Sequence, residues 1–167
     1  MGKTIGIISG KGGVGKTTLA INLGLAMHHF GEDVTVIDGD IKNPSIGLYL
    51  GMHNLSVTIN SVLRDGNVND AVHCLGLKII PASLAVNAVD LAKATMFSSL
   101  DGYKIIDFPP GLDRDILSLL NACDEVIIVT NPNILSIAST LRLIDIVKGL
   151  DKGILGIAMN MAGKSYE

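Results

Sequence analysis

A glycine-rich segment near the N-terminus constrains the fold of this chain more than any other feature of its sequence. It reads Gly10-Lys11-Gly12-Gly13-Val14-Gly15-Lys16-Thr17-Thr18. The segment follows a short aliphatic run at residues 4–9 and opens a stretch at 17–30 whose apolar residues recur at helical spacing. The sequence therefore predicts a strand, a tight glycine-rich loop and a helix in immediate succession.

The spacing of Gly10, Gly15, Lys16 and Thr17 matches the phosphate-binding loop pattern in full. Glycines let the backbone wrap closely around an anion with its N–H groups pointing inward, and the following helix start adds partial positive charge. We expect Lys16 to bridge the β- and γ-phosphates of a nucleotide and the Thr17 hydroxyl to bind Mg²⁺. An incidental glycine-rich turn is the alternative, and the strand and helix predicted on either side disfavour it.

Strand-like and helical segments alternate along the rest of the chain. Strands are predicted at residues 33–38, 77–81, 103–108, 124–130 and 154–160, and helices at 58–63, 85–100, 113–122 and 136–150, with Pro44-Ser45 opening a short helix. Apolar residues make up 48% of the chain and aromatic residues 4%, which favours aliphatic strands buried on both faces. The predicted fold is an α/β P-loop NTPase, a three-layer α/β/α sandwich with a mostly parallel central sheet, in one domain over residues 1–167.

Acidic residues end two of these predicted strands. Asp107 precedes Pro109-Pro110-Gly111, where we expect it to bind the metal while the Gly111 N–H senses a γ-phosphate. Asp38 and Asp40 end the predicted strand at 33–38, also at the carboxyl edge where ligands collect in open α/β sheets. One of these two carboxylates is expected to orient the attacking water, with a solvated Asp-Gly-Asp turn as the alternative.

Charge and cysteine content narrow the class of protein. The formal net charge is −3 and no basic cluster is visible, which argues against non-specific DNA binding. Cys74 and Cys123 stand alone without a Cys-x-x-Cys motif, so we expect two reduced, partly buried thiols. No targeting segment is visible and no apolar run approaches the ~18 residues of a membrane span. We therefore expect a cytoplasmic protein.

Lys11 distinguishes the loop from most phosphate-binding loops. Residues 11–18 resemble the deviant Walker A motif of the MinD/ParA family of ATPases. The resemblance continues in order along the chain. Residues 36–40 resemble the switch I entry, 105–111 the Walker B and switch II segment, 124–132 the next strand with its Thr-x-Pro end, and 157–160 the strand that contacts adenine.

The resemblance implies ATP and Mg²⁺ as ligands and an ATP-dependent homodimer. It implies that Lys11 reaches across the dimer to the partner's phosphates, that Asp40 positions the hydrolytic water, and that Asn160 contacts adenine. Lys11, Lys16 and Asp40 are then the catalytic residues of a slow ATPase. Because a lysine supplied in trans acts like an arginine finger, hydrolysis would depend on assembly.

Residues 47–52 and 57–63 look more like MinD-type than ParA-type proteins. That likeness implies a switch in cell-division site placement or spatial regulation, with an unidentified regulatory protein partner. MinD proteins continue into further strand–helix units and an amphipathic tail that binds membrane, so peripheral membrane attachment is expected only in a longer form. Without such units, the last predicted strand would leave an exposed sheet edge.

Two positions depart from the family pattern, and three other functions stay open. Phe108 follows Asp107 where Thr is frequent, and the Pro-Gln that ParA proteins carry after the second Asp is missing. The alternatives are a ParA-like DNA-partition ATPase, an Mrp-type iron-sulfur cluster carrier and a non-catalytic nucleotide-binding module.

Overall fold

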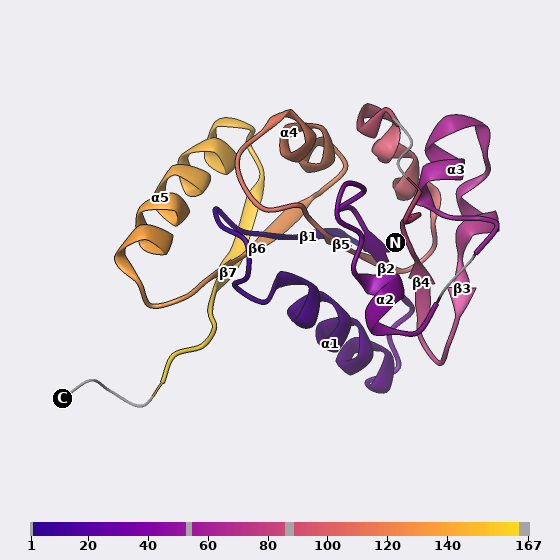
Figure 1. Cartoon of the computed structure of the whole chain (residues 1–167), viewed down its shortest axis with the longest axis horizontal. Coiled ribbons are helices and arrows are strands. Elements are labelled where there is room, and N and C mark those ends of the chain that lie inside the picture. Colours follow the sequence, from indigo (N-terminus) through magenta and orange to yellow (C-terminus); the bar gives the residue numbers. More distant parts are fainter. Residues whose placement is uncertain (1, 53–54, 86–88, 164–167) are drawn as a thin grey trace.

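A seven-stranded sheet forms the centre of the molecule across the residues that the computed structural model describes, 2–52, 55–85 and 89–163 (Figure 1). Its order is β3-β4-β2-β5-β1-β6-β7. All neighbouring strands are parallel except β3, which runs antiparallel to β4. The strands are β1 (Thr4–Ile8), β2 (Val34–Asp38), β3 (His73–Cys74), β4 (Lys78–Ile80), β5 (Tyr103–Asp107), β6 (Glu125–Thr130) and β7 (Gly153–Met159).

Helices cover both faces of this sheet. On one face lie α1 (Lys16–His29) and the short α2 (Ile46–Tyr49). On the other face lie α3 (Ile59–Asp65), the 3₁₀ helices η1 (Val68–Ala71) and η2 (Leu91–Ser99), α4 (Arg114–Asn121) and α5 (Ile134–Gly149). The predicted three-layer α/β/α sandwich is confirmed. No helix in the described part of the chain is both long and apolar enough to cross a bilayer.

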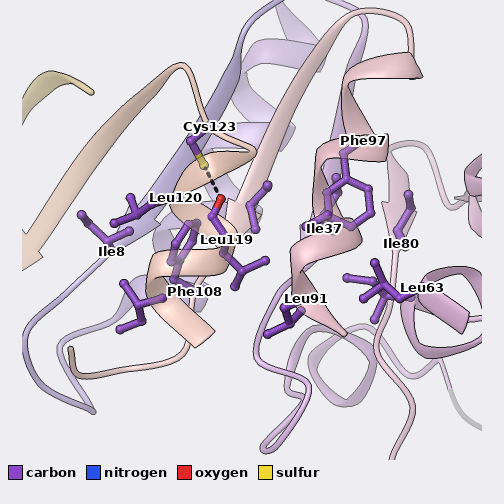
Figure 2. Close-up of a cluster of buried hydrophobic side chains, with 14 of the residues drawn as sticks. Ile8, Ile37, Leu63, Ile80, Leu91, Phe97, Phe108, Leu119, Leu120 and Cys123 are labelled. Carbon is purple, nitrogen blue, oxygen red and sulfur yellow. Dashed lines mark hydrogen bonds between the residues drawn. The ribbon is translucent and has the colours of Figure 1, made fainter. Parts of the chain in front are cut away.

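Alternate residues of the central strands enter two different cores. Ile7 and Ile105 pack toward α1, whereas Ile8, Ile37 and Ile106 pack with Phe97 and Leu119 on the opposite face (Figure 2). Each of these isoleucines is fully buried. Burying one such side chain contributes about 1.5–3 kcal/mol to folding stability. The middle of the sheet is therefore a rigid support for the loops that follow its strands.

The helix predicted at residues 85–100 is confirmed only in part, over residues 91–99 and as a 3₁₀ helix. Within the described residues this segment forms η2, a 3₁₀ helix that starts after Asp90, while 86–88 lie outside the described residues. Its buried residues recur every three positions, at Leu91, Ala94, Phe97 and Leu100. Side chains at i and i+3 eclipse in a 3₁₀ helix, so this spacing places all four side chains on one buried line.

The strand β3 was not predicted. Its two residues, His73 and Cys74, pair with Ile79 and Lys78 of β4, and the His73 ring Nε2 lies 2.9 Å from the Val57 carbonyl oxygen. Two residues are too few to show a strand pattern in sequence. The thiol predictions are half right, because Cys123 is buried but Cys74 is exposed.

Within the described residues β7 lies at the edge of the sheet, where the last strand was expected. It pairs with β6 on one side, and its side chains Leu155, Ile157 and Met159 are each about half exposed. The sheet is therefore well covered in the middle and thinly covered at this end.

Candidate nucleotide-binding site

The carboxyl ends of three adjacent strands bring together the segments that the sequence analysis selected. Asp107 of β5 is in register with Ile7 of β1 on one side and with Asp38 of β2 on the other. Because the strands are parallel, the loops at 9–15, 39–45 and 108–113 leave the sheet at the same edge. The central position of β1 and β5 in the sheet order thus assembles the site.

The glycine-rich loop has the backbone that its sequence predicts. Gly13 and Gly15 have positive φ angles of 74° and 95°. A β-carbon on Gly15 would lie 2.3 Å from Nδ2 of Asn160, so this position has no room for a side chain. Gly15 precedes α1, whose first turn has neither a side-chain cap nor an acidic residue. Its first N–H groups are therefore available to an anion.

Lys16 lies within this loop with only 7% of its surface exposed. Burial lowers the pKa of its ammonium group, while the attraction of Asp107 and then Asp40 acts in the opposite direction. A buried cation with carboxylates nearby costs desolvation energy that a bound phosphate would offset.

Thr17 is held by residues from two other segments. Its Oγ1 donates a hydrogen bond to Asp107 Oδ2 at 2.5 Å and lies 3.1 Å from Ser45 Oγ. The other carboxylate oxygen of Asp107 is buried and has no partner among the described residues. Burial raises the pKa of Asp107 to about 6, although the Thr17 hydrogen bond and Lys16 oppose the shift.

Asp38 and Asp40 differ in burial and in hydrogen-bond partners. The sequence left open which of the two carboxylates orients the attacking water. Asp38 is fully buried, and its Oδ2 accepts hydrogen bonds from the backbone N–H groups of Ser45 and Ile46, both at 3.0 Å. Burial and repulsion by Asp107 raise its pKa to about 7.

Asp40 is partly exposed, and its Oδ1 accepts a hydrogen bond from Asn43 N at 3.0 Å. Burial raises its pKa too, against that hydrogen bond and Lys16.

The oxygen groups around Thr17 fit a hard divalent cation. Mg²⁺ prefers oxygen ligands and binds to one or two protein groups together with phosphate oxygens and water. The Thr17 hydroxyl and the unpaired Oδ1 atoms of Asp38 and Asp107 are such ligands. Among the described residues no group of three or more His, Cys, Asp or Glu side chains could hold a metal by itself. Phosphate oxygens would therefore have to complete the site.

Lys11 and Gly12 belong to the loop itself, and Gly111 is hydrogen-bonded to the residue before it. Lys11 is partly exposed, and within the described part of the chain its ammonium group has no ion-pair partner. Gly12 lies close to Pro110, since a β-carbon there would be 3.8 Å from that ring. The Gly111 N–H donates to the Ser9 carbonyl oxygen at 3.2 Å, so this bond would have to break before Gly111 could meet a γ-phosphate.

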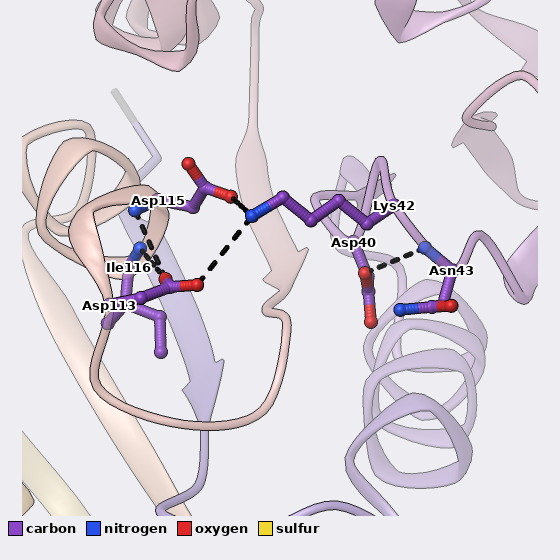
Figure 3. A network of polar contacts seen from close by, with 6 residues as sticks. All are labelled: Asp40, Lys42, Asn43, Asp113, Asp115 and Ile116. Atoms are coloured by element: carbon purple, nitrogen blue, oxygen red, sulfur yellow. Dashed lines mark hydrogen bonds and ion pairs between the residues drawn. The ribbon is translucent and has the colours of Figure 1, made fainter. Parts of the chain in front are cut away.

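An ion pair joins the loop that follows β2 to the start of α4 (Figure 3). The Lys42 Nζ lies 2.5 Å from Asp115 Oδ2 and 3.7 Å from Asp113 Oδ2. Asp113 also caps α4, because its Oδ1 accepts from the N–H groups of Asp115 and Ile116. Lys42 and Asp113 are exposed and Asp115 is partly exposed, so solvent and salt weaken these contacts.

A hollow of about 370 Å³ lies beside the loop and contains Asn160. The Asn160 Nδ2 donates to the Val14 carbonyl oxygen at 2.9 Å, which ties the end of β7 to the loop. The hollow has room for a base next to the phosphate position. It is lined by Gly15, Thr18, Leu19, Asn22, Val129, Ala158, Met159 and Asn160.

Sequence reasoning selected Lys16, Thr17, Asp107 and Asn160, and the structure places all four around the loop. It missed Ser45 and Asn22. Asn22 is one helical turn after Thr18, and its Nδ2 donates to the Thr18 carbonyl oxygen at 2.7 Å, so helical spacing alone could have indicated it. Ser45 has no such signal, because only the packing of α2 brings it to Thr17.

Known proteins resemble this chain over nearly its whole length. A model of the ParA family, described as NUBPL iron-transfer P-loop NTPase, matches residues 1–166. An uncharacterized ATP-binding protein of Methanocaldococcus jannaschii is 35% identical over 96% of this chain and 64% of its own length. The septum site-determining protein MinD of Thermotoga maritima is 31% identical over 89% of the chain and 59% of its own. An iron-sulfur cluster carrier protein of M. jannaschii is 32% identical over 94% of the chain and 59% of its own.

Solved structures support the same relationship. The septum site-determining protein MinD of Pyrococcus horikoshii, complexed with Mg-ADP, is 33% identical with a TM-score of 0.90, covering 99% of this chain and 73% of that one. A MinC:MinD cell division protein complex of Aquifex aeolicus is 29% identical with a TM-score of 0.79, covering 93% of this chain and 68% of that one. The chain thus spans about three fifths of the length of the curated relatives it matches. With its phosphate-binding loop, its sheet order and these matches, the chain belongs to the ParA family of P-loop NTPases.

Proposed function

We propose that this chain binds ATP with Mg²⁺, hydrolyses it slowly and uses it as an ATP-dependent dimerisation switch, with residues 1–167 forming one ATPase domain. The observation that carries the proposal is the arrangement around Thr17. At the carboxyl edge of the sheet, the Thr17 hydroxyl donates to the Asp107 carboxylate, and the buried Lys16 lies close enough to be attracted by that carboxylate. Such a set supports phosphoryl transfer, in which catalysis depends on positioning and charge stabilisation.

Each residue has a distinct role in the proposed reaction. Lys16 binds the β- and γ-phosphates, and Asp107 fixes the rotation of the Thr17 hydroxyl through its 2.5 Å hydrogen bond. Bound Mg²⁺ supplies neutralisation of the phosphate charge. Asp40 is the carboxylate that orients the attacking water, because it is partly exposed beside Lys16 whereas Asp38 is committed to the start of α2.

Dimerisation would complete this site. Lys11 and Lys16 are the cations of the loop, and neither has an ion-pair partner in the described residues, but Lys16 is buried whereas Lys11 is partly exposed. In a face-to-face dimer it would reach the partner's phosphates and make hydrolysis depend on assembly. ATP and ADP would then select different quaternary states.

A role in cell-division site placement or other spatial regulation is the finer part of the proposal. MinD proteins are among its relatives, and one solved relative is a MinC:MinD complex, which supports a regulatory protein as partner. Membrane attachment would need a C-terminal amphipathic tail like that of MinD proteins.

Solution mass by light scattering, with ATP·Mg²⁺ and with ADP·Mg²⁺, tests the proposal. We expect a dimer with ATP alone, and we expect Asp40→Ala to keep that dimer by blocking hydrolysis. Lys11→Ala should bind ATP as the wild type does but stay monomeric. A wild-type protein that binds ATP and remains monomeric would contradict the switch, and a protein that releases no phosphate would contradict the ATPase.

Iron-sulfur cluster transfer is a second candidate, favoured by the family description and by the iron-sulfur cluster carrier among the relatives. The thiols of this chain argue against it. Cys123 is buried, its Sγ donates to the Leu119 carbonyl oxygen at 3.5 Å, and burial raises its pKa to about 12. Only the exposed Cys74 is left to ligate iron. Iron and sulfide content after anaerobic reconstitution, compared between the wild type and Cys74→Ser, decides between the two functions.

A further inference from the structure

We propose that Ser45 is a positioning residue of the metal site and that it ties helix α2 to the bound metal and nucleotide. The inference rests on the proposed binding of Mg²⁺ and nucleotide at Thr17. It concerns a residue that motif patterns do not select, because Ser45 is 28 residues from Thr17 in sequence.

The hydrogen atoms around Thr17 can be assigned from the contacts. Thr17 Oγ1 carries one hydrogen, and its 2.5 Å contact with Asp107 Oδ2 uses that hydrogen because an ionised carboxylate only accepts. The hydroxyl of Ser45, 3.1 Å away, must therefore donate to Thr17 Oγ1. A hydroxyl oxygen has two lone pairs, so one remains for a metal. Asp107 and Ser45 together fix the direction in which that lone pair points.

The Ser45 hydroxyl has no hydrogen-bond partner other than Thr17 among the described residues. Serine at a helix N-cap normally accepts a hydrogen bond from the second or third N–H of its own helix. Ser45 is the N-cap of α2, yet its side chain makes no capping bond. Asp38 Oδ2 instead holds the start of α2, accepting from the N–H groups of Ser45, the N-cap residue, and Ile46, the first residue of the helix. The position of α2 is thus set by Asp38, and the Ser45 hydroxyl is left to bind Thr17.

Two buried carboxylate oxygens next to this pair point to a cation. Asp38 Oδ1 and Asp107 Oδ1 have no partner among the described residues, and both side chains are at least 99% buried. Their residues are in register on neighbouring strands. Unpaired buried carboxylate oxygens are costly, and a divalent ion at Thr17 would satisfy them directly or through its water ligands.

These contacts connect the proposed metal position to the exposed surface of α2. Ser45 and Asp38 both connect the start of α2 to the metal position, and α2 carries Leu48 and Tyr49, which are 52% and 69% exposed. Metal and nucleotide binding should therefore reduce the mobility of α2 and of this exposed pair.

Binding of Mn²⁺ to the ADP complex, followed by electron paramagnetic resonance of the free ion, tests the inference in the full chain. Ser45→Ala should weaken Mn²⁺ binding about tenfold, the lower end of the loss when a residue that orients a metal ligand is removed. Its affinity for ADP in EDTA should equal that of the wild type. Ser45→Thr, which keeps the hydroxyl, should restore Mn²⁺ binding, and the exposed Ser99→Ala is the matched control.

Amide hydrogen exchange across 46–50 is the second readout. Addition of Mg²⁺ and ADP should slow exchange in the wild type and in Ser45→Thr, and should have no such effect in Ser45→Ala. Wild-type affinity for Mn²⁺ in Ser45→Ala would overturn the inference, as would equal losses in Ser45→Ala and Ser45→Thr, which would indicate packing. A wild type that binds ADP but no Mn²⁺ would overturn the proposed function as well.

Discussion

The central strands of the sheet and the edge strand β7 contain similar aliphatic residues but differ in how far these residues are buried. All five residues of β1 and all five of β2 are buried. In β7, Leu155, Ile157 and Met159 remain about half exposed. The difference is one of coverage, because helices pack on both faces at the centre and only part of one face is covered at the edge.

This contrast separates two parts of the candidate site. Lys16, Thr17, Asp38 and Asp107 belong to the centre, where low polarity makes charges expensive and shifts their pKa values. Asn160 belongs to the edge, where it forms a wall of the open hollow. In the proposed function, the rigid centre would hold phosphate and metal, and the loosely covered edge would hold the base.

The largest expected difference between the two regions is in stability. Ile105→Ala in β5 should lower the free energy of unfolding by about 2–5 kcal/mol, because it opens a cavity in a closed core. Ile157→Ala in β7, which is 52% exposed, should cost under about 1 kcal/mol. Urea unfolding of the two variants measures the contrast. Equal losses would show that the edge is covered in solution.

Nucleotide affinity should depend on the centre more than on the edge. Lys16→Ala removes charge-assisted hydrogen bonds worth about 1.5–3 kcal/mol each, so ATP binding should fall on the order of 100-fold. Asn160→Ala should reduce it about tenfold or less, since a neutral hydrogen bond contributes about 1 kcal/mol. Calorimetric titration with ATP·Mg²⁺ gives both values. A larger loss for Asn160→Ala would reverse the proposed division of roles.

The buried carboxylate of Asp38 should make stability depend on pH. Its pKa is raised to about 7 from an ordinary value of 3.8. Below about pH 4 the group is protonated in both states, and its contribution to stability is fully present. Between pH 4 and 7 the unfolded chain releases the proton first, so this contribution is lost as the pH rises.

Asp38→Asn removes that dependence. In EDTA at pH 8 the variant should be more stable than the wild type by on the order of 1–3 kcal/mol, and the difference should shrink at pH 4. Urea unfolding at the two pH values measures it, with the exposed Asp145→Asn as control. A constant difference between pH 4 and pH 8 would contradict the assignment.

The smallest effect is expected at the surface ion pair. Lys42→Ala breaks the contacts with Asp113 and Asp115, but Lys42 and Asp113 are exposed and Asp115 is partly exposed, so solvent screens these contacts. We expect no measurable change in melting temperature at physiological salt. Salt dependence of ATP turnover is the sharper measurement, because the pair joins the loop after β2 to the start of α4. A clear loss of thermal stability would show that these two segments are held more firmly than their exposure indicates.

Local patterns in the sequence were enough to predict the glycine-rich loop, the order of most strands and helices, and Asp107 as a strand-terminal acid. These features depend on residues close in the chain: glycine spacing, aliphatic runs and helical periodicity. The short antiparallel β3 could not be predicted, because His73 and Cys74 become a strand only through pairing with β4. The 3₁₀ form of η2 has a signal in its buried period of three, but that signal is visible only once burial is known.

The sequence by itself determined that a phosphate-binding loop follows the first strand, since Gly13 and Gly15 permit the left-handed backbone and Lys16 and Thr17 follow at once. Only the tertiary structure decided the different environments of Asp38 and Asp107. The pairing of β2 with β5 buries Asp38 against Asp107, and the folding of α2 onto that edge brings Ser45 to Thr17. Contacts between residues far apart in sequence depend on the order of the strands, and that order is a property of the packed sheet.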